Sequence, residues 1–400
     1  MKFVLPRVIH GNRGDLLSRW GVICALNRFN ENDVTVFADA VEEVPPVPLN
    51  FVPYAKFFNL LLRPSGWQTL RKADVVLWAV GLDIQDESSI AKLFYLDALF
   101  TIYKCFGLRI WCVFQGAGPL STSTGKTIAK RIIRKVDLFV ARDPGTHDLI
   151  KNMSPDSRCL LAHDAIFLPG IEMRYQPKVS DKCRAIATPA TRTSRPHIGF
   201  NIRQWYHFAS RFLPYQFRKE RYRRRSAGRM KELVVAASHT IQSLRDQFDA
   251  RILLFSAYQS NLVQWEDDLP WLEEIKRVFL KDPEVILVDN ELTIPEYVEF
   301  ISQLDLMVGM RLHSCLIALR MGVPAVNINY SLKGRDIMRH LSLDDRVIEL
   351  EDFMSDPYTI TAKVRQILTN GESERMRVRT AVNQAVEYNQ RVLKSILSEG

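Results

Sequence analysis

The chain lacks several features that would place it quickly in a known class. No segment of its 400 residues approaches the roughly 18 uninterrupted apolar residues of a membrane-spanning helix. Residues 1–15 contain no sustained apolar stretch of the kind found in secretory signals. The six cysteines are scattered without a Cys-x-x-Cys pair, so neither a disulfide framework nor a zinc site is expected. We therefore expect a cytoplasmic protein without a metal site.

Familiar catalytic and nucleotide-binding motifs are also missing. The chain has no Gly-x-Ser-x-Gly, so a serine-histidine-aspartate hydrolase has no support. Residues 114–127 resemble the P-loop Gly-x-x-x-x-Gly-Lys-Ser/Thr, but Leu120 stands where the first glycine is required. Histidines outside the motifs below show no metal-ligand spacing and are expected to be structural or solvated: His163, His207, His239 and His340.

Excess positive charge is confined to one segment. The formal net charge is +9, and residues 211–231 carry nine basic residues against one acid, so the rest of the chain is nearly neutral. The basic residues are Arg211, Arg218, Lys219, Arg221, Arg223, Arg224, Arg225, Arg229 and Lys231. No nucleic-acid-binding motif accompanies them, so nucleic acid is not an expected partner. The segment is either a solvated, mobile loop or a contact with a diphosphate or an anionic membrane, which would make the protein peripheral to the membrane.

Short apolar strands alternate with helical stretches, an order that predicts an α/β fold with mainly parallel sheets. We expect two doubly wound, Rossmann-like domains facing a cleft, at residues 1–175 and 197–371. A polar, proline-containing linker (176–196) joins them, and residues 372–400 form a C-terminal amphipathic helix. The expected strands are 3–9, 34–37, 75–80, 109–114, 138–141, 159–162, 197–202, 252–256, 285–288, 304–308 and 325–329, and one expected helix is 228–248.

A permanent cation and an imidazole follow one strand of the second domain. Strand 304–308 leads into Arg311, Leu312 and His313, where a helix begins. Free N–H groups and the dipole at a helix start favour an anion. Arg203 ends another strand of this domain, and two arginines suit a small dianion or trianion because each binds carboxylate or phosphate bidentately. Alone, Arg203 would be read as an ordinary surface residue.

Two loops of the first domain combine glycines with polar groups. At residues 10–15 the backbone can turn tightly and present Asn12 and Asp15 at a helix start. The alternative is a plain strand-to-helix turn with Asp15 as its cap. Gly116 and Gly118 follow a second strand and suit close approach of a phosphate or sugar.

Taken in order, these motifs resemble the polysaccharide pyruvyl transferase family. The best match is residues 309–314 (GMRLHS), followed by Gly322-Val-Pro324 and by Tyr330 with Lys333. The family similarly has Arg-x-His, then Gly-x-Pro, then a Tyr with a nearby Lys. Supporting matches follow the family's order: Gly11, Asn12, Gly14, Asp15, Gly116, Gly118, Pro119, Arg142, Asp143, Asp164 and Arg203.

The resemblance implies a fold like that of the two-domain GT-B glycosyltransferases, with the acceptor on the first domain and the donor on the second. The implied donor is phosphoenolpyruvate, and the acceptor is a sugar of a glycan or of its lipid-linked precursor. The product is a pyruvate ketal, with phosphate released and no further cofactor. Arg203, Arg311 and His313 would contact the donor. The remaining substrate-binding residues would be Asn12, Gly116, Gly118, Leu312 and Lys333.

Ketal formation suggests roles for two residues. A proton must reach the methylene carbon as a sugar hydroxyl attacks its neighbour. His313 is the best candidate acid, because histidine titrates near neutral pH. Asp15 is a candidate base for the sugar hydroxyl. This scheme requires no metal.

Some segments have no assigned ligand role. The family often has Gly-Gly where this chain has Val80-Gly81, and residues 211–231 have no counterpart. Arg142 and Asp143 are expected to pair with each other and fix their loop. Two other functions remain open: a GT-B-type glycosyltransferase that uses a nucleotide sugar, and a non-catalytic glycan-assembly protein with the same fold.

Overall fold

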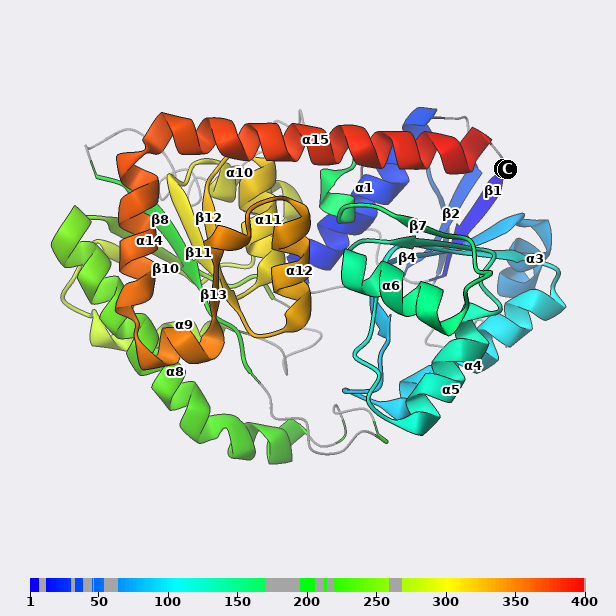
Figure 1. Ribbon diagram of the computed structural model, residues 1–400, viewed down its shortest axis with the longest axis horizontal. Coiled ribbons are helices and arrows are strands. Elements are labelled where there is room, and N and C mark those ends of the chain that lie inside the picture. Colours follow the sequence, from blue (N-terminus) through cyan, green and yellow to red (C-terminus); the bar gives the residue numbers. More distant parts are fainter. Residues whose placement is uncertain are drawn as a thin grey trace.

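Two parallel sheets, each covered by helices, confirm the predicted α/β class with two Rossmann-like domains. The computed structural model describes residues 1–6, 12–29, 33–38, 45, 47–53, 64–169, 195–205, 212–213, 217, 219–258 and 268–398. In Figure 1 the domains lie side by side along the long axis, the first on the right and the second on the left.

The first domain contains a seven-stranded parallel sheet in the order β3-β2-β1-β4-β5-β6-β7. Its strands are β1 (Lys2–Leu5), β2 (Asp33–Ala38), β3 (Asn50–Pro53), β4 (Val75–Ile84), β5 (Arg109–Ala117), β6 (Leu138–Ala141) and β7 (Cys159–Leu161). Its helices are α1 (Arg13–Phe29), α3 (Pro64–Lys72), α4 (Ile90–Cys105), α5 (Ser123–Ile133) and α6 (Pro144–Met153). The strand order reverses between β1 and β4.

The second domain repeats this plan with six parallel strands in the order β10-β9-β8-β11-β12-β13. Its strands are β8 (His197–Asn201), β9 (Arg251–Phe255), β10 (Val285–Val288), β11 (Leu306–Gly309), β12 (Ala325–Asn329) and β13 (Val347–Glu349). Its helices are α8 (Lys219–Phe248), α9 (Leu269–Val278), α10 (Ile294–Ser302), α11 (Leu312–Arg320), α12 (Leu332–His340), α13 (Leu350–Ser355), α14 (Tyr358–Thr369) and α15 (Gly371–Ser398). The order reverses between β8 and β11. Ligands of doubly wound sheets bind at strand carboxyl ends beside such reversals, and the predicted motifs follow β1, β8 and β11.

Most predicted strands are present with shifted ends, and three differences have a physical cause. Strand β3 was not predicted because it is a four-residue edge strand that ends in proline, and β13 has only three residues. Helix α8 begins at Lys219 and not at residue 228, because its arginine- and lysine-rich first turns favour helix and Gly228 does not end it. From Lys219 onward the basic segment is therefore helical, which corrects the loop interpretation. The domain boundaries stay a prediction, since residues 170–194, most of the proposed linker, lie outside the described residues.

Strands β4 and β5 each contain a residue of unusual backbone conformation just before the predicted glycine loop. Val80 and Phe114 lie opposite each other and have φ values of 57° and 52°. Positive φ is unusual for branched or bulky residues, and surrounding packing must hold it. Both side chains are buried in the first domain's core. Val80 thus adopts the backbone conformation for which a glycine is better suited.

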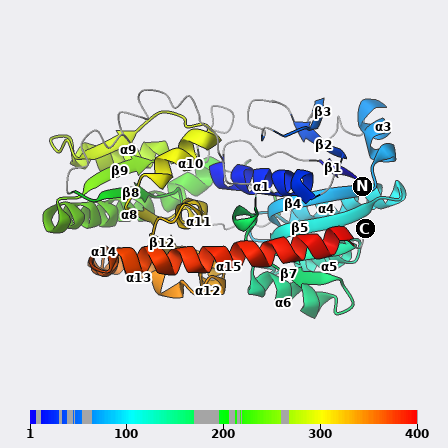
Figure 2. The same cartoon turned by 90° about the horizontal axis from the view of Figure 1, so that it is seen from above.

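Two helices join the domains. Helix α1 buries Leu16 and Leu17 in a core cluster of the second domain, while Ile23 and Leu26 pack into the first. Helix α15 runs across both domains in Figures 1 and 2, and its two halves bury side chains in the same two clusters. Each fully buried leucine contributes about 1.5–3 kcal/mol. So extensive an apolar contact favours one fixed arrangement of the domains.

Two observations bear on the environment of the protein. None of the helices in the described ranges is both long and apolar enough to cross a membrane. The described cysteines are unpaired: Cys24, Cys105, Cys112, Cys159 and Cys315. The cytoplasmic location stays a prediction.

Candidate active site

The start of α1 packs directly onto the start of α11. The backbone N–H of Arg13 donates to the carbonyl of Ala257 (3.2 Å), which draws this turn against the second domain. A Cβ on Gly14 would lie 2.1 Å from the Cβ of His313. Only glycine allows so close an approach, so the glycine of the N-terminal motif serves to bring the first domain to His313.

His313 lies between two carboxylates of the first domain. Its Nδ1 is 3.7 Å from the nearer Asp15 oxygen and its Nε2 is 3.7 Å from an Asp164 oxygen. Nε2 is buried and has no hydrogen-bond partner in the described part of the chain. The His313 side chain is 15% exposed, so the imidazole can meet a ligand while it lies between the two carboxylates.

Asp164 is the fixed member of this group. Its carboxylate is fully buried and accepts hydrogen bonds from the Ser18 hydroxyl (3.3 Å), the Ile166 N–H (3.1 Å) and Arg142 Nη1 (3.1 Å). Burial alone would raise the pKa of Asp164, but His313, Arg142 and the Ile166 N–H hold that pKa well below its usual range. Asp164 is therefore a permanent negative charge beside His313.

Asn12, and not Asp15, caps helix α1. The Asn12 side-chain oxygen accepts the N–H groups of Gly14 (3.1 Å) and Asp15 (3.4 Å). Its side-chain NH₂ donates to the Asp15 carboxylate at 2.9 Å. The interpretation of Asp15 as the cap is therefore wrong. Asn12 orients the Asp15 carboxylate, whose side chain is 20% exposed, toward His313.

Two cations meet at Gly116, next to Asp164. A Cβ on Gly116 would lie 3.3 Å from both Arg142 Nε and Lys333 Nζ, so this glycine leaves room for the two side chains. Arg142 pairs with Asp164, while Asp143 caps α6 by accepting the N–H of Thr146 (2.7 Å). The expected Arg142–Asp143 pair is therefore wrong. Asp143 serves as the N-cap of α6, and Arg142 instead binds Asp164, which comes from a different loop.

Lys333 reaches the first domain from α12 of the second. Its ammonium donates to the carbonyl of Ala117 at 2.9 Å. Burial, together with the charge of Arg142, lowers the pKa of Lys333 to about 7. In the described residues Arg142 Nε has no hydrogen-bond partner. Arg142 and Lys333 thus form a positive group suited to an anion.

Arg311 is held inside the second domain. Its Nε and Nη2 each donate to the buried carboxylate of Asp268 at 2.7 Å, a bidentate pair. Its guanidinium carbon also lies 5.3 Å from the ring centre of Tyr258. This pairing compensates the charge of Arg311 and fixes the start of α11.

The other predicted residues occupy separate positions. Arg203 stacks on Tyr330, 4.7 Å from the ring centre, and donates to its hydroxyl. Leu312 is half-buried against the second domain's core. Gly118 has a φ of 79°, a turn conformation that favours glycine, and a Cβ there would lie 3.0 Å from Leu149. His313, Asp15, Asn12, Gly116 and Lys333 thus lie around Asp164 and Arg142, whereas Arg203 and Arg311 have partners of their own.

Two acidic residues were given no role from the sequence. Asp164 matched the family's order, but the strand before it, β7, has only three residues and offered no motif that would assign it a partner. Asp268 lies in a stretch without any motif, so nothing pointed to it as the partner of Arg311. In the ranges that the structure describes, no three His, Cys, Asp or Glu side chains lie close enough to hold a metal ion.

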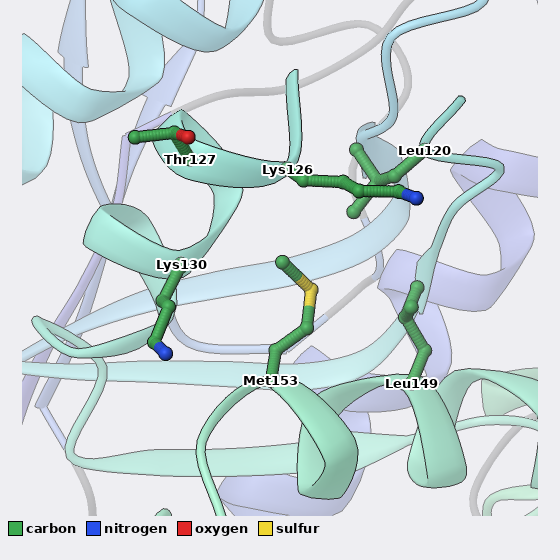
Figure 3. A pocket seen from close by; sticks show the side chains of 6 residues that line it. All are labelled: Leu120, Lys126, Thr127, Lys130, Leu149 and Met153. Carbon is green, nitrogen blue, oxygen red and sulfur yellow. The ribbon is translucent and has the colours of Figure 1, made fainter. Parts of the chain in front are cut away.

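A cavity of about 310 Å³ lies elsewhere, between α5 and α6 (Figure 3). Its lining is mainly apolar but includes two lysine side chains. The residues that line it are Leu120, Lys126, Thr127, Lys130, Leu149 and Met153. Lys126 belongs to the stretch that resembles a P-loop. In the structure Thr122 is the N-cap of α5, and its side-chain oxygen accepts the N–H of Gly125 (2.9 Å). The Gly125 N–H, which a P-loop would direct at a phosphate, is therefore bound by the cap.

The fold and the position of this site define a class. Two Rossmann-like domains meet over residues that follow β1, β8 and β11, which is the GT-B-like arrangement. Solved structures agree: UDP-N-acetylglucosamine 2-epimerase from Neisseria meningitidis bound to UDP-GlcNAc superposes with a TM-score of 0.60 over 100% of both chains, at 10% identity. HepE from Anabaena in complex with UDP and glucose gives 0.53 over 100% of both chains, at 11% identity.

Comparison of the sequence with known families identifies the family within that class. The model of the polysaccharide pyruvyl transferase family matches residues 12–331, so the chain belongs to that family of transferases. A curated relative, the amylovoran biosynthesis protein AmsJ of Erwinia amylovora, is 34% identical over 92 residues. The match spans 23% of this chain and 22% of that protein's length.

Proposed function

We propose that the protein transfers the enolpyruvyl group of phosphoenolpyruvate to a sugar of a polysaccharide or of its lipid-linked precursor. The product is a pyruvate ketal, and phosphate is released. One observation carries the proposal: His313 lies between Asp15 and Asp164, beside the Arg142–Lys333 cation pair, and we assign it as the proton donor. Acid chemistry next to an anion site is what this transfer requires.

The donor carries a phosphate and a carboxylate, and the site offers cations for both. Arg142 and Lys333 at Gly116 suit the phosphate, because both approach the same point. For the carboxylate we assign Arg203, which is partly exposed after β8 and stacks on Tyr330, three residues before Lys333. Arg311 contributes chiefly by holding α11 in place through Asp268. Leu312, Asn12 and Gly118 shape the surrounding walls.

His313 and Asp15 together can supply and recover the proton that the first step needs. One sugar hydroxyl attacks the central carbon of the enolpyruvyl group while His313 delivers a proton to the methylene carbon, which becomes a methyl group. Asp15 accepts the proton of that hydroxyl and can return it to His313. A second hydroxyl then displaces phosphate, which leaves with the second hydroxyl proton. Asp164 stays ionised and stabilises the imidazolium.

A thermal-shift comparison tests the donor. Phosphoenolpyruvate is expected to raise the melting temperature, and UDP or GDP is not. The reverse result would favour a nucleotide-sugar glycosyltransferase, since the neighbouring folds above were solved with UDP or a UDP-sugar. If neither ligand binds, the protein is a non-catalytic member of the family.

A further inference from the structure

A second charged region lies at the start of α8. Residues 219–231 carry seven basic residues and one acidic residue, Glu220. Tyr222 and Met230 are buried against the domain, whereas Arg221, Arg224 and Arg225 are exposed. The i, i+3, i+4 spacing places these three guanidinium groups on one face of the helix. The start of α8 therefore presents a dense positive face to the outside.

Large apolar side chains are exposed close to this face in the sequence. Phe217, two residues before α8, is 75% exposed, and Phe212 and Leu213 are 61% and 39% exposed. Phe94 in α4 is 45% exposed. Exposed large apolar side chains next to a basic helix are the kind of feature that marks a binding surface.

Two hydrogen bonds anchor Phe212 to the first domain. The carbonyl of Phe212 accepts the N–H of Ala91 and the hydroxyl of Ser89, both at 3.0 Å, at the first turn of α4. Phe94 lies one turn further along α4. The exposed apolar groups therefore come from both domains, and Phe212 is held beside the first turn of α4.

We propose that Phe94, Phe212, Leu213, Phe217, Arg221, Arg224 and Arg225, the basic-aromatic surface, dock the protein onto an anionic lipid bilayer. Arginines attract acidic head groups, and exposed phenylalanines insert at the boundary with the acyl chains. A soluble polyanion would use only the charges and would leave Phe217 in water. The combination therefore favours a bilayer.

The place of this surface in the molecule agrees with docking. Figure 1 shows the start of α8 at the lower edge of the view and α15 along the upper edge, on the opposite side. Because both domains contribute, a bilayer would contact them in the arrangement that α1 and α15 maintain. This inference does not depend on the donor or on the reaction.

Cosedimentation of the full chain with lipid vesicles tests the proposal. Wild-type protein is expected to bind vesicles of equal parts phosphatidylglycerol and phosphatidylcholine, and not vesicles of phosphatidylcholine alone. The triple variant R221Q/R224Q/R225Q is expected to bind on the order of a hundredfold more weakly. A matched control, R379Q/R391Q/K394Q, removes three charges from exposed positions of α15 and is expected to bind like wild type.

A second variant separates lipid insertion from charge. Phe217→Ser, at the most exposed of these side chains, is expected to weaken vesicle binding several-fold. That loss should persist at about 1 M salt, where charges are screened within about 3 Å. The proposal is overturned if the triple variant and its α15 control bind equally, or if both lipid compositions bind equally. Binding to soluble heparin without binding to vesicles would overturn it in favour of a glycan partner.

Discussion

Arg311 and His313 stand two residues apart at the start of α11, and the structure uses them in opposite ways. The Arg311 guanidinium faces its own domain and makes two 2.7 Å hydrogen bonds to the buried carboxylate of Asp268. The His313 imidazole faces the other domain and lies 3.7 Å from each of two carboxylates. We refer to these as the Arg311 side and the His313 side of the site.

We propose that this difference separates a structural charge, Arg311, from a reactive group, His313. A buried, bidentate pair that loses one partner leaves an uncompensated charge, so the Arg311 side resists change. On the His313 side the distances exceed those of hydrogen bonds, and the imidazole is partly exposed. Such a group can exchange a proton with a substrate without breaking the fold. The following changes test this division.

The largest effect is expected from His313→Gln. Loss of the acid should lower kcat for pyruvyl transfer by roughly a thousandfold, within the range of general acid catalysis. Binding of phosphoenolpyruvate, measured by thermal shift, should remain. Full turnover by this variant would remove His313 from the mechanism.

Asp268→Asn should instead destabilise the fold. It leaves Arg311 buried without its counter-charge, at a cost of about 3–5 kcal/mol in the free energy of unfolding, measured with urea. The matched change on the His313 side, Asp15→Asn, should cost under about 1 kcal/mol because that carboxylate is partly exposed. Equal losses in the two variants would contradict the division.

Lys333 should make donor binding depend on pH. Because the pKa of Lys333 is about 7 in the donor-free protein, its ammonium is lost as the pH rises through 7. An anion binds the charged form, so affinity for phosphoenolpyruvate should fall up to about tenfold per unit above pH 7. Calorimetric titration from pH 7 to 9 measures this, and Lys333→Met should bind weakly with a flat profile. A slope unchanged in Lys333→Met would assign the dependence to another group.

The smallest effect concerns a histidine pair next to Asp164. His163 and His340 stack across the two domains with ring centres 3.9 Å apart. Burial and His340 lower the pKa of His163 to about 3, and burial also lowers the pKa of His340. The unfolded chain then binds more protons, so stability present above the ordinary pKa of 6.5 is lost as the pH falls toward 3.

Replacing His163 should reduce that acid sensitivity. The contribution of one such histidine at about pH 5 is about 1–2 kcal/mol. Melting temperatures of His163→Phe should therefore fall less between pH 7 and 5 than those of wild type. His239→Gln, at an exposed histidine of α8, should fall like wild type. Parallel curves for all three proteins would show that the pair does not sense acid.

Much of the fold could be predicted from local pattern. Apolar strands alternating with helices indicated two doubly wound domains, and polar motifs after the strands indicated the site. Asp15 and His313 were predicted to share a site, and they lie 3.7 Å apart. Within the site, the wrong assignments concern partners: Arg142 was expected to pair with Asp143, and Asp15 was the alternative choice for the cap that Asn12 provides. Adjacent residues are the natural first choice for a pair, whereas Arg142 and Asp164 approach only because β6 and β7 are neighbours in the sheet.

The sequence alone determined the class of the protein, its family and the position of Arg311-Leu312-His313 between a strand and a helix. These follow from periodicity and from residue order, which are local properties. Only the tertiary structure decided the roles of the two charged residues. Asp268 reaches Arg311 across 43 residues and Asp164 approaches His313 across 149, and packing decides which buried charge is compensated. That packing pairs Arg311 within its own domain and leaves His313 partly exposed between two carboxylates, where we propose that it acts as the acid.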